Sequence, residues 1–470
     1  MSKELSIDYL KSDKLKFIFF GLLLGFIIAY SAVSKDRYAV SVLALIISPI
    51  FLLMPLKFTI ALFIGFSFAF QSDFAWNVME FGGTQIRTQE MLVMLSFLLL
   101  GIDILKGTKK IRLTPLSKAF IPFLLYYFVA LYIGLNNNNV ASFMNIDTRS
   151  FLSYSVVFPL TYFFQKDEDA VLFYKIILIA FGVFIFTTLS PLFFGNILPV
   201  AIRDRGRVWI RNVVIMPFSI TLMLQMLFFT DKKREKIIIL VLIPIALLVL
   251  LISQTRVAWV GMAIMLCLFL IVNYFKVIEP QKRSYYLKRF FQYLAIGFVL
   301  LILTIFFFLK DEFGEVWELR FITFKYLKYD PSLWARRLGG HESKYLIAQS
   351  PWFGLGLGAE WNTMGKPMNS TDNYYWMALV KLGIIGTIIM LLGYMVWCYE
   401  LLYLFTRWKQ IENKYQKALI ITITLFFPTI FIMMIVTMHL FAPSIIISYL
   451  SLAAFTDFTY CRLKQKKDKD

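Results

Sequence analysis

The sequence predicts an all-α integral membrane protein, and its composition, its apolar runs and the placement of its basic residues all point to this class. Hydrophobic residues make up 59% of the 470 residues and charged residues only 16%, whereas about 25% of a typical soluble domain is charged. A soluble fold of this length has too little interior to bury so much apolar surface, so lipid must solvate much of the chain.

About fourteen apolar runs approach the roughly 20 residues that a membrane-spanning helix needs, and we expect them to form one polytopic domain over residues 1–470. Twelve spans remain the alternative if the pair at 39–71, which Pro49 and Pro55 interrupt, or the pair at 417–458 re-enters the membrane. The first run has no small-residue cleavage site and is expected to be retained. The runs lie near residues 16–33, 39–54, 57–71, 90–105, 118–135, 150–165, 171–190, 212–230, 236–252, 257–275, 290–309, 383–405, 417–437 and 441–458.

The net charge of +19 is explained by membrane topology, because the basic residues flank apolar spans instead of forming a patch on a folded domain. We therefore expect no nucleic-acid partner. Short cytoplasmic loops collect Lys and Arg, and fourteen spans bring every strongly basic segment to one side, with both termini in the cytoplasm. These segments are 106–118, 231–236, 276–289, 407–417 and 462–470.

Arginine is concentrated on the opposite, outer side of this topology. Eleven of the 17 arginines fall there, but only seven of the 31 lysines. Topology signals treat Lys and Arg alike, so they do not predict this split, whereas the planar guanidinium binds phosphate through two parallel hydrogen bonds. The split favours an anion site on the outer face, with stray surface arginines as the alternative.

Arg256 opens a predicted span within the sequence SQTRVAW at 253–259. An arginine at membrane level is costly and is a functional candidate by default, although a boundary residue that extends to the headgroups is the alternative.

A second arginine group lies on one short outer loop before the span at 212–230. Asp204 supplies a single compensating charge, so a pyrophosphate would suit the group, and a solvated run of charges is the alternative. The group comprises Arg203, Arg205, Arg207 and Arg211.

The longest outer loop runs from about 310 to 382, and loops of this length are usually functional. Helices are predicted within it at 313–329 and 333–349. The glycine turn at 354–358 has neither P-loop nor dinucleotide-binding spacing, so nucleotide use is not supported. We expect this turn to fold the loop back onto the helix bundle.

The second loop helix contains Arg336, Arg337 and His341. Arg337 and His341 are four residues apart and share one face. A lone histidine is more often structural than catalytic, so His341 is at most a candidate for the acceptor side.

Asp372 and Asn373 precede the aromatic residues Tyr374, Tyr375 and Trp376 at the end of the loop. A carboxylate can accept a proton from a sugar hydroxyl, and aromatic faces stack on sugar rings. Asp372 as a helix N-cap is the alternative. We find no cluster with metal-ligand spacing, and no pair of the three cysteines has zinc spacing. No metal or cofactor is therefore expected.

The order of these features over residues 203–386 resembles the O-antigen ligase and O-antigen polymerase superfamily of bacterial envelope glycosyltransferases. The arginine that opens a span is followed by a long external loop with paired arginines on a helix. The remaining motifs are SPWFGLGLG at 350–358, DNYYW at 372–376 and KLGIIG at 381–386.

The resemblance implies an undecaprenyl-diphosphate-linked oligosaccharide as donor, at the outer face of the bacterial inner membrane. It implies inverting transfer without nucleotide or metal. Arg256 and Arg337 would hold the diphosphate, with Arg207 or Arg211 as a supplement. The remaining substrate-binding candidates are Arg203, Arg336, His341, Asn373 and Tyr374.

The ligases of this superfamily have a histidine as proposed base where this chain has Asp372. An aspartate there looks more like the polymerase branch, so we expect a polymerase that joins lipid-linked repeat units, with a second lipid-linked unit as acceptor. Whether a separate partner regulates chain length stays open. The alternatives are a ligase that transfers glycan to a lipid or protein acceptor and a flippase for the same lipid. A flippase should have two related halves, which this sequence does not show.

Overall fold

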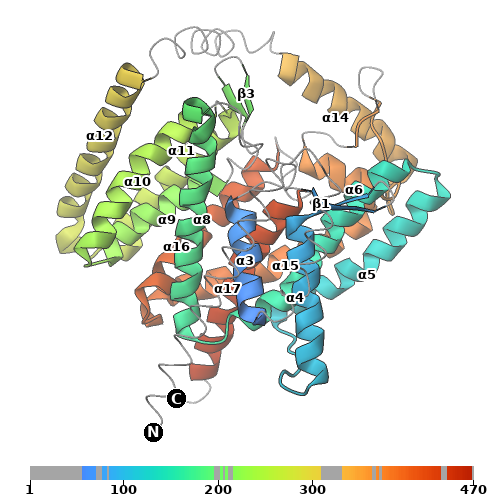
Figure 1. Ribbon diagram of the computed structural model, residues 1–470, viewed down its shortest axis with the longest axis horizontal. Helices are drawn as coiled ribbons and strands as arrows, with labels where there is room; N and C mark the ends of the chain where they lie inside the picture. Colours follow the sequence, from blue (N-terminus) through green and yellow to red (C-terminus); the bar gives the residue numbers. More distant parts are fainter. Residues whose placement is uncertain are drawn as a thin grey trace.

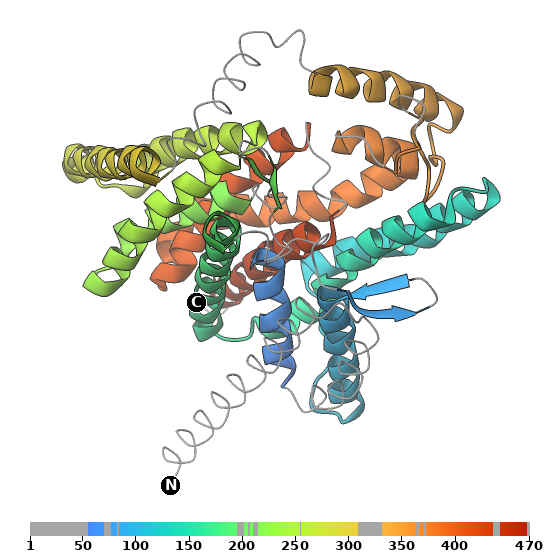
Figure 2. The ribbon, with the colours of Figure 1, turned by 45° about the horizontal axis from the view of Figure 1, so that its top comes forward.

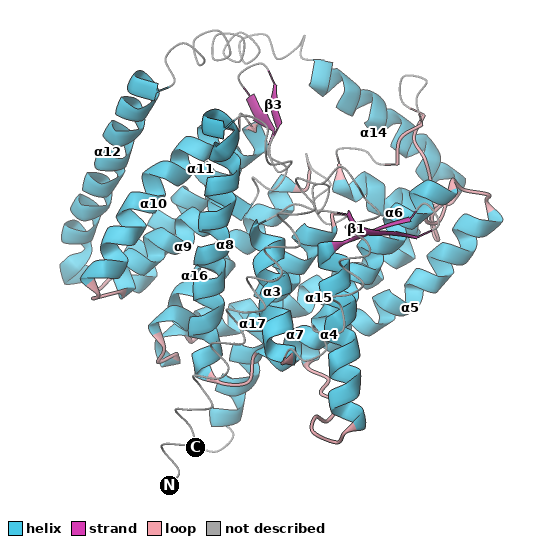
Figure 3. Cartoon of the chain, in the orientation of Figure 1, coloured by secondary structure: helices cyan, strands magenta, loops and turns pink. Residues whose placement is uncertain are grey.

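The computed structural model describes residues 55–69, 77–81, 84–194, 202–204, 207–209, 215–253, 255–308, 331–362, 367–369, 373–435 and 442–467. Within these ranges the chain is almost entirely helical, with two short β-hairpins (Figures 1 and 3). The predicted spans at 16–33 and 39–54 and the predicted helix at 313–329 lie outside them. The coarse prediction of a helical membrane protein agrees with this architecture, whereas the two hairpins were not expected.

Five described helices are long and apolar enough to cross a membrane. They are Pro115–Asn136, Asp167–Leu189, Arg256–Val277, Tyr374–Thr406 and Lys414–Met433. The long helices in chain order are α3 (Leu56–Ala69), α4 (Thr88–Leu105), α5 (Pro115–Asn136), α6 (Ala141–Ser153), α8 (Asp167–Phe194), α9 (Ile215–Phe229), α10 (Lys233–Ile252), α11 (Arg256–Val272), α12 (Arg283–Phe308), α14 (Pro331–Gln349), α15 (Tyr374–Thr406), α16 (Lys414–Met433) and α17 (Pro443–Lys467).

The short elements are the short helix α7 (Val157–Phe163), the 3-10 turns η1 (Tyr154–Val156), η3 (Pro280–Lys282) and η6 (Trp408–Gln410), and the π-helical turn η2 (Asn273–Val277). The antiparallel hairpins are β1 (Asn77–Phe81) with β2 (Thr84–Arg87), and β3 (Ile202–Asp204) with β4 (Arg207–Trp209).

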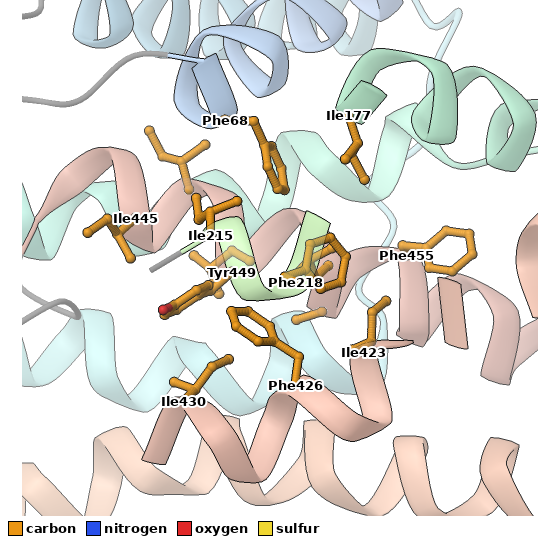
Figure 4. Close-up of a cluster of buried hydrophobic side chains, with 14 of the residues drawn as sticks. Phe68, Ile177, Ile215, Phe218, Ile423, Phe426, Ile430, Ile445, Tyr449 and Phe455 are labelled. Atoms are coloured by element: carbon orange, nitrogen blue, oxygen red, sulfur yellow. The ribbon is translucent and has the colours of Figure 1, made fainter. Parts of the chain in front are cut away.

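Helix α17 runs through the centre of the bundle, and every side chain from 445 to 460 is buried. Ser451, Thr456 and Thr459 tolerate this position because their hydroxyls donate to carbonyls one turn earlier, as Ser451 Oγ does to Ile447 at 2.7 Å. Around it, Phe426 of α16 lies 5.1 Å from Phe218 of α9 and 5.7 Å from Tyr449 of α17, measured between ring centroids (Figure 4).

The predicted span at 150–165 is not one helix. The chain forms α6, the turn η1 and the seven-residue α7 instead. Tyr154 lies in this break with its ring 4.9 Å from that of Phe123, and its hydroxyl is 3.2 Å from that of Tyr394. Packing of this ring against α5 and α15 therefore takes precedence over the apolar pattern that predicted a continuous span.

One end of the bundle contains the segments that the sequence singled out. Both ribbon views draw α14 across this end, beside α15 (Figures 1 and 2), and the two helices are in contact. The β3–β4 hairpin and the beginning of α11 lie at the same end (Figure 1). The connections between α9 and α10 and between α11 and α12 lie at the far ends of those helices.

Candidate functional site

Helix α14 is attached to the rest of the protein through its inner face. Ser343 is buried, and its hydroxyl donates to the carbonyl of Gly339 at 2.6 Å and accepts the indole N–H of Trp361 at 2.8 Å. The carboxylate of Glu342 accepts the backbone N–H of Asn362. These bonds fix the rotation of the helix about its own axis.

The outer face of α14 presents Arg337 and His341, both exposed, as their spacing of four residues predicts. Arg336 is half-buried. The helix begins within two residues of the predicted position and runs unbroken through Gly339 and Gly340. The two side chains therefore lie one helical turn apart on an exposed face that a ligand can reach.

The glycine turn that follows α14 lies between α5 and α15. The backbone N–H of Leu355 donates to the carbonyl of Val380 at 2.7 Å, and that of Leu357 donates to the carbonyl of Ala130 at 3.0 Å. One side of the turn is thus bonded to α15 and the other to α5. This is the fold-back onto the bundle that the sequence led us to expect.

Glycine is required where the turn meets α5. Gly356 has a φ of +83°, and a Cβ on it would lie 2.2 Å from the backbone nitrogen of Gly134. A Cβ on Gly134 would lie 2.3 Å from the carbonyl oxygen of Leu357. Two backbones therefore approach here with no room for any side chain between them.

The asparagine run after α5 completes this contact. Asn137 is the C-cap of α5, and its side-chain amide donates to the carbonyl of Leu355 at 3.0 Å. The amide of Asn139 donates to the carbonyls of Leu355 and Leu357 at 2.8 and 2.9 Å. The amides of this run therefore satisfy two carbonyls of the glycine turn.

Helix α15 is interrupted at Gly383, which has a φ of +65°. The hydrogen bonds lost inside the helix are replaced by the loop, since Ile384 donates to the carbonyl of Pro351 at 2.9 Å and Ile385 to that of Trp352 at 3.1 Å. The predicted span began at residue 383, so it corresponds to the part of α15 beyond this interruption.

A buried ion pair lies beneath the loop. Lys381 of α15 is 0% exposed and Asp147 of α6 is 1% exposed, with Nζ 2.6 Å from Oδ1. The ammonium also donates to the backbone carbonyl and to the side-chain oxygen of Asn369, at 2.8 and 2.9 Å. The other carboxylate oxygen of Asp147 accepts the backbone N–H of Gly358 at 2.7 Å. The three donors of the ammonium therefore all have acceptors.

Asn373 is the N-cap of α15, because its side chain accepts the backbone N–H groups of Tyr375 and Trp376 at 2.9 and 3.2 Å. The capping role that we had considered for Asp372 is thus performed by Asn373. Tyr374 is 1% exposed, with its hydroxyl 2.8 Å from the sulfur of Met390. Its ring is packed in the bundle and is not open to a substrate in this conformation. Asp372 itself lies outside the described residues.

Arg256 is the first residue of α11 and is half-buried. A helix N-terminus has free backbone N–H groups and the positive end of the helix dipole, so it adds to the attraction for an anion. The indole N–H of Trp259 donates to the carbonyl of Leu250 at 2.9 Å. This bond fixes the beginning of α11 against the end of α10.

The β3–β4 hairpin contains Arg203 and Arg207, and its register pairs Arg203 with Val208 and Asp204 with Arg207. Arg205 and Arg211 lie outside the described residues. In the described part of the chain, no three His, Cys, Asp or Glu residues are grouped so that they could hold a metal ion.

A scan against models of known protein families and a search of curated proteins both gave no match. The resemblance in the order of motifs therefore remains a prediction.

Sequence reasoning missed Asp147 and the buried role of Lys381. Lys381 is the first residue of the motif KLGIIG at 381–386. A signal was present, since a lysine enclosed by apolar residues on both sides at membrane level needs a partner. Nothing in the local sequence of α6 singles out Asp147, because its partner is 234 positions away.

Proposed function

We propose that the protein is a membrane glycosyltransferase that polymerises undecaprenyl-diphosphate-linked oligosaccharide repeat units into a surface polysaccharide. The observation that carries the proposal is the gathering of arginine-bearing segments at one end of the bundle (Figure 1). These segments are α14 with Arg336 and Arg337, the β3–β4 hairpin with Arg203 and Arg207, and the start of α11 with Arg256.

The chemistry follows from these residue types. A hydroxyl of the acceptor sugar attacks the anomeric carbon of the donor, the bond from that carbon to the diphosphate oxygen breaks, and undecaprenyl diphosphate leaves. Arg256 and Arg337 stabilise the charge that develops on the diphosphate. Asp372 takes the proton of the attacking hydroxyl. Binding both lipid-linked sugars in one cavity at the lipid edge supplies their orientation.

The attachment of the chain on both sides of Asp372 supports its role as the base. Asn369, three residues earlier, is hydrogen-bonded to the buried Lys381. Asn373, the next residue, caps α15. A base must be held near the hydroxyl that it deprotonates, and these two neighbours restrict where the chain can carry Asp372.

The proposal includes an orientation in a bacterial inner membrane. We place about fourteen spans in it, with both termini in the cytoplasm and the arginine-bearing end facing the periplasm. The positive-inside rule supports this orientation. Helix α11 begins at the arginine-bearing end, and the basic segment 276–289 follows its other end. The basic segment 407–417 likewise follows the far end of α15.

Reconstitution tests the proposal. The full-length protein in liposomes is mixed with the host's undecaprenyl-diphosphate repeat unit, without nucleotide or added metal, and the products are separated by size. We expect a ladder at multiples of the repeat unit. If no ladder forms but glycan is transferred once a lipid core or protein acceptor is added, the protein is a ligase. If neither reaction occurs while the lipid crosses the bilayer, the protein is a flippase.

A further inference from the structure

A cleft of about 430 Å³ lies away from the arginine-bearing end, between η2, the start of α12, η6 and the start of α16. Its volume falls within the range of about 300–1,000 Å³ that is typical of ligand pockets. Four cationic side chains line it, two from each of two basic segments that are more than a hundred residues apart in sequence. They are Lys276, Arg283, Lys409 and Lys417.

The carboxylate that lines this cleft already has a positively charged partner. Glu279 is the carboxylate among the lining residues, and its Oε2 lies 2.7 Å from Nζ of Lys282. The hydrogen bond from the Lys282 ammonium holds the pKa of the Glu279 carboxyl below its ordinary value. Lys282 thereby brings its own positive charge to the rim, so the cleft as a whole retains a strong excess of positive charge.

Arg283 lines the cleft and has one hydrogen-bond donor that is unused in the described part of the chain. Its Nη2 donates to the carbonyl of Phe275 at 3.4 Å, and its guanidinium lies 5.0 Å from the ring centroid of Tyr274. Its Nε is shielded from solvent and has no hydrogen-bond partner within the described residues. A shielded donor without an acceptor is costly, so the protein itself leaves this guanidinium incompletely hydrogen-bonded.

The cleft adjoins apolar surface. Phe275 lines it and is 68% exposed, and Ile271, one turn earlier on α11, is 54% exposed. Trp408 forms a buried wall of the cleft, with the Lys417 ammonium 5.9 Å from its ring centroid. A ligand with a phosphate group joined to apolar chains would match both the cations and the exposed apolar side chains.

We propose that this cleft binds the phosphate headgroup of an anionic phospholipid from the leaflet opposite the arginine-bearing end. Basic pockets between membrane helices on the cytoplasmic side are suited to such headgroups. Membrane topology requires only that basic residues stay on this side. Lys106 and Lys110 of another basic segment meet that requirement while exposed to solvent. The four cations of the cleft instead line one concave surface, where Lys276, Arg283 and Lys417 are part-buried and Lys409 is exposed.

Native mass spectrometry of the full-length protein in detergent tests the proposal, with phosphatidylglycerol and phosphatidylcholine as probes. The wild type should retain phosphatidylglycerol in preference. The double variant Arg283→Gln/Lys409→Gln should bind it about fivefold more weakly per cation removed. The double variant Lys106→Gln/Lys110→Gln, which loses the same charge outside the cleft, should bind as the wild type does. Thermal unfolding in detergent without added phospholipid checks that each variant is folded.

Three outcomes would overturn the proposal. In the first, the wild type retains both lipids equally. In the second, the cleft variant and the control variant lose phosphatidylglycerol to the same extent, which would leave only the general attraction of basic loops. The third outcome is tested by a parallel titration with inorganic phosphate. If phosphate binds the wild type, is lost in the cleft variant, and displaces no lipid, the site recognises a soluble anion instead of a membrane lipid.

Discussion

Lys381 Nζ lies 2.6 Å from Oδ1 of Asp147, and both side chains are sealed from solvent. The pair joins α15 to α6, and through Asn369 and Gly358 it also holds the loop that returns from α14. A charge at this depth is stable only while its partner and its hydrogen bonds are in place. The docking of the loop and the ion bridge between α6 and α15 therefore depend on each other.

Replacing one member of this pair should be strongly destabilising. Lys381→Met leaves the Asp147 carboxylate buried with no counter-charge, and breaking buried pairs in this way costs about 3–5 kcal/mol. Thermal unfolding in detergent measures the loss. Lys466→Met is the matched control, because Lys466 also lies 2.7 Å from a carboxylate, that of Glu412, but both side chains are exposed. It should leave the unfolding temperature unchanged.

The double variant Lys381→Met/Asp147→Leu separates the effect of a buried unpaired charge on stability from the effect of lost packing and hydrogen bonds. With both charges gone, no ion is left buried, so much of the lost stability should return. Asn369 and Gly358 would still lose their partners, so the loop should remain less firmly attached. A double variant as unstable as the two single losses combined would show that the two residues act independently.

Helix positions were predictable where one local signal decides them. Loop helix α14 was predicted at 333–349 and is found at Pro331–Gln349, because Pro331 can occupy its first turn and Ser350-Pro351 ends it. Positions decided by distant residues were not predictable. The break at Tyr154 depends on rings from α5 and α15, and the partner of Lys381 is 234 positions away.

In the candidate site, too, the features set by local sequence were predictable and those set by distant residues were not. Helix periodicity alone predicts that Arg337 and His341 share one face of α14. In the structure they do, and both are exposed. That Tyr374 is packed inside the bundle does not follow from its sequence, because an aromatic residue at a helix start can point either way. Its burial depends on how α15 is rotated, which the cap at Asn373 and the contact with Met434 determine.

Gly356→Ala should detach the glycine turn from α5. The new Cβ would lie 2.2 Å from a backbone atom of Gly134, and the φ of +83° disfavours any side chain. Residues in such backbone conformations cost about 1–3 kcal/mol before any clash is counted. We expect a loss of about 2 kcal/mol or more in the free energy of unfolding, together with faster proteolysis between α14 and α15.

Gly101→Ala provides the comparison for that variant. Gly101 lies in α4, where no described residue beyond its own helix backbone comes within 4 Å of an added Cβ, and alanine is the better helix former by about 1 kcal/mol. This variant should be as stable as the wild type or slightly more so. Equal losses in the two variants would mean that the contact between Gly356 and Gly134 contributes nothing specific.

Arg337→Gln should reduce polymer synthesis without altering the fold. The side chain is exposed on α14, so its loss removes little packing. If it holds the diphosphate as proposed, a charge-assisted contact in the transition state disappears, and losses of about 100-fold or more in rate are typical for such groups. Lys344→Gln on the same helix removes the same charge from another exposed position and should keep wild-type activity. Equal activity of both variants would exclude Arg337 from the site.

Arg256→Lys tests whether geometry matters at the start of α11. The substitution keeps the positive charge but removes the planar fork that binds two phosphate oxygens at once. We expect polymer yield in the reconstituted assay to fall well below that of the wild type while the protein remains folded. Full activity would favour a residue that only marks the membrane boundary, since a lysine can extend to the headgroups equally well.

Asp372→Asn tests the proposed base directly. The amide has nearly the same shape as the carboxylate but cannot take a proton, so chain elongation should stop while binding of the lipid-linked donor is retained. Asn373→Asp is a useful companion, because aspartate is as good an N-cap as asparagine and should preserve α15. It should leave the unfolding temperature near that of the wild type. Long polysaccharide chains made by Asp372→Asn at the wild-type rate would remove this residue from the mechanism. The arginines could then still bind a diphosphate, but a different group would have to accept the proton.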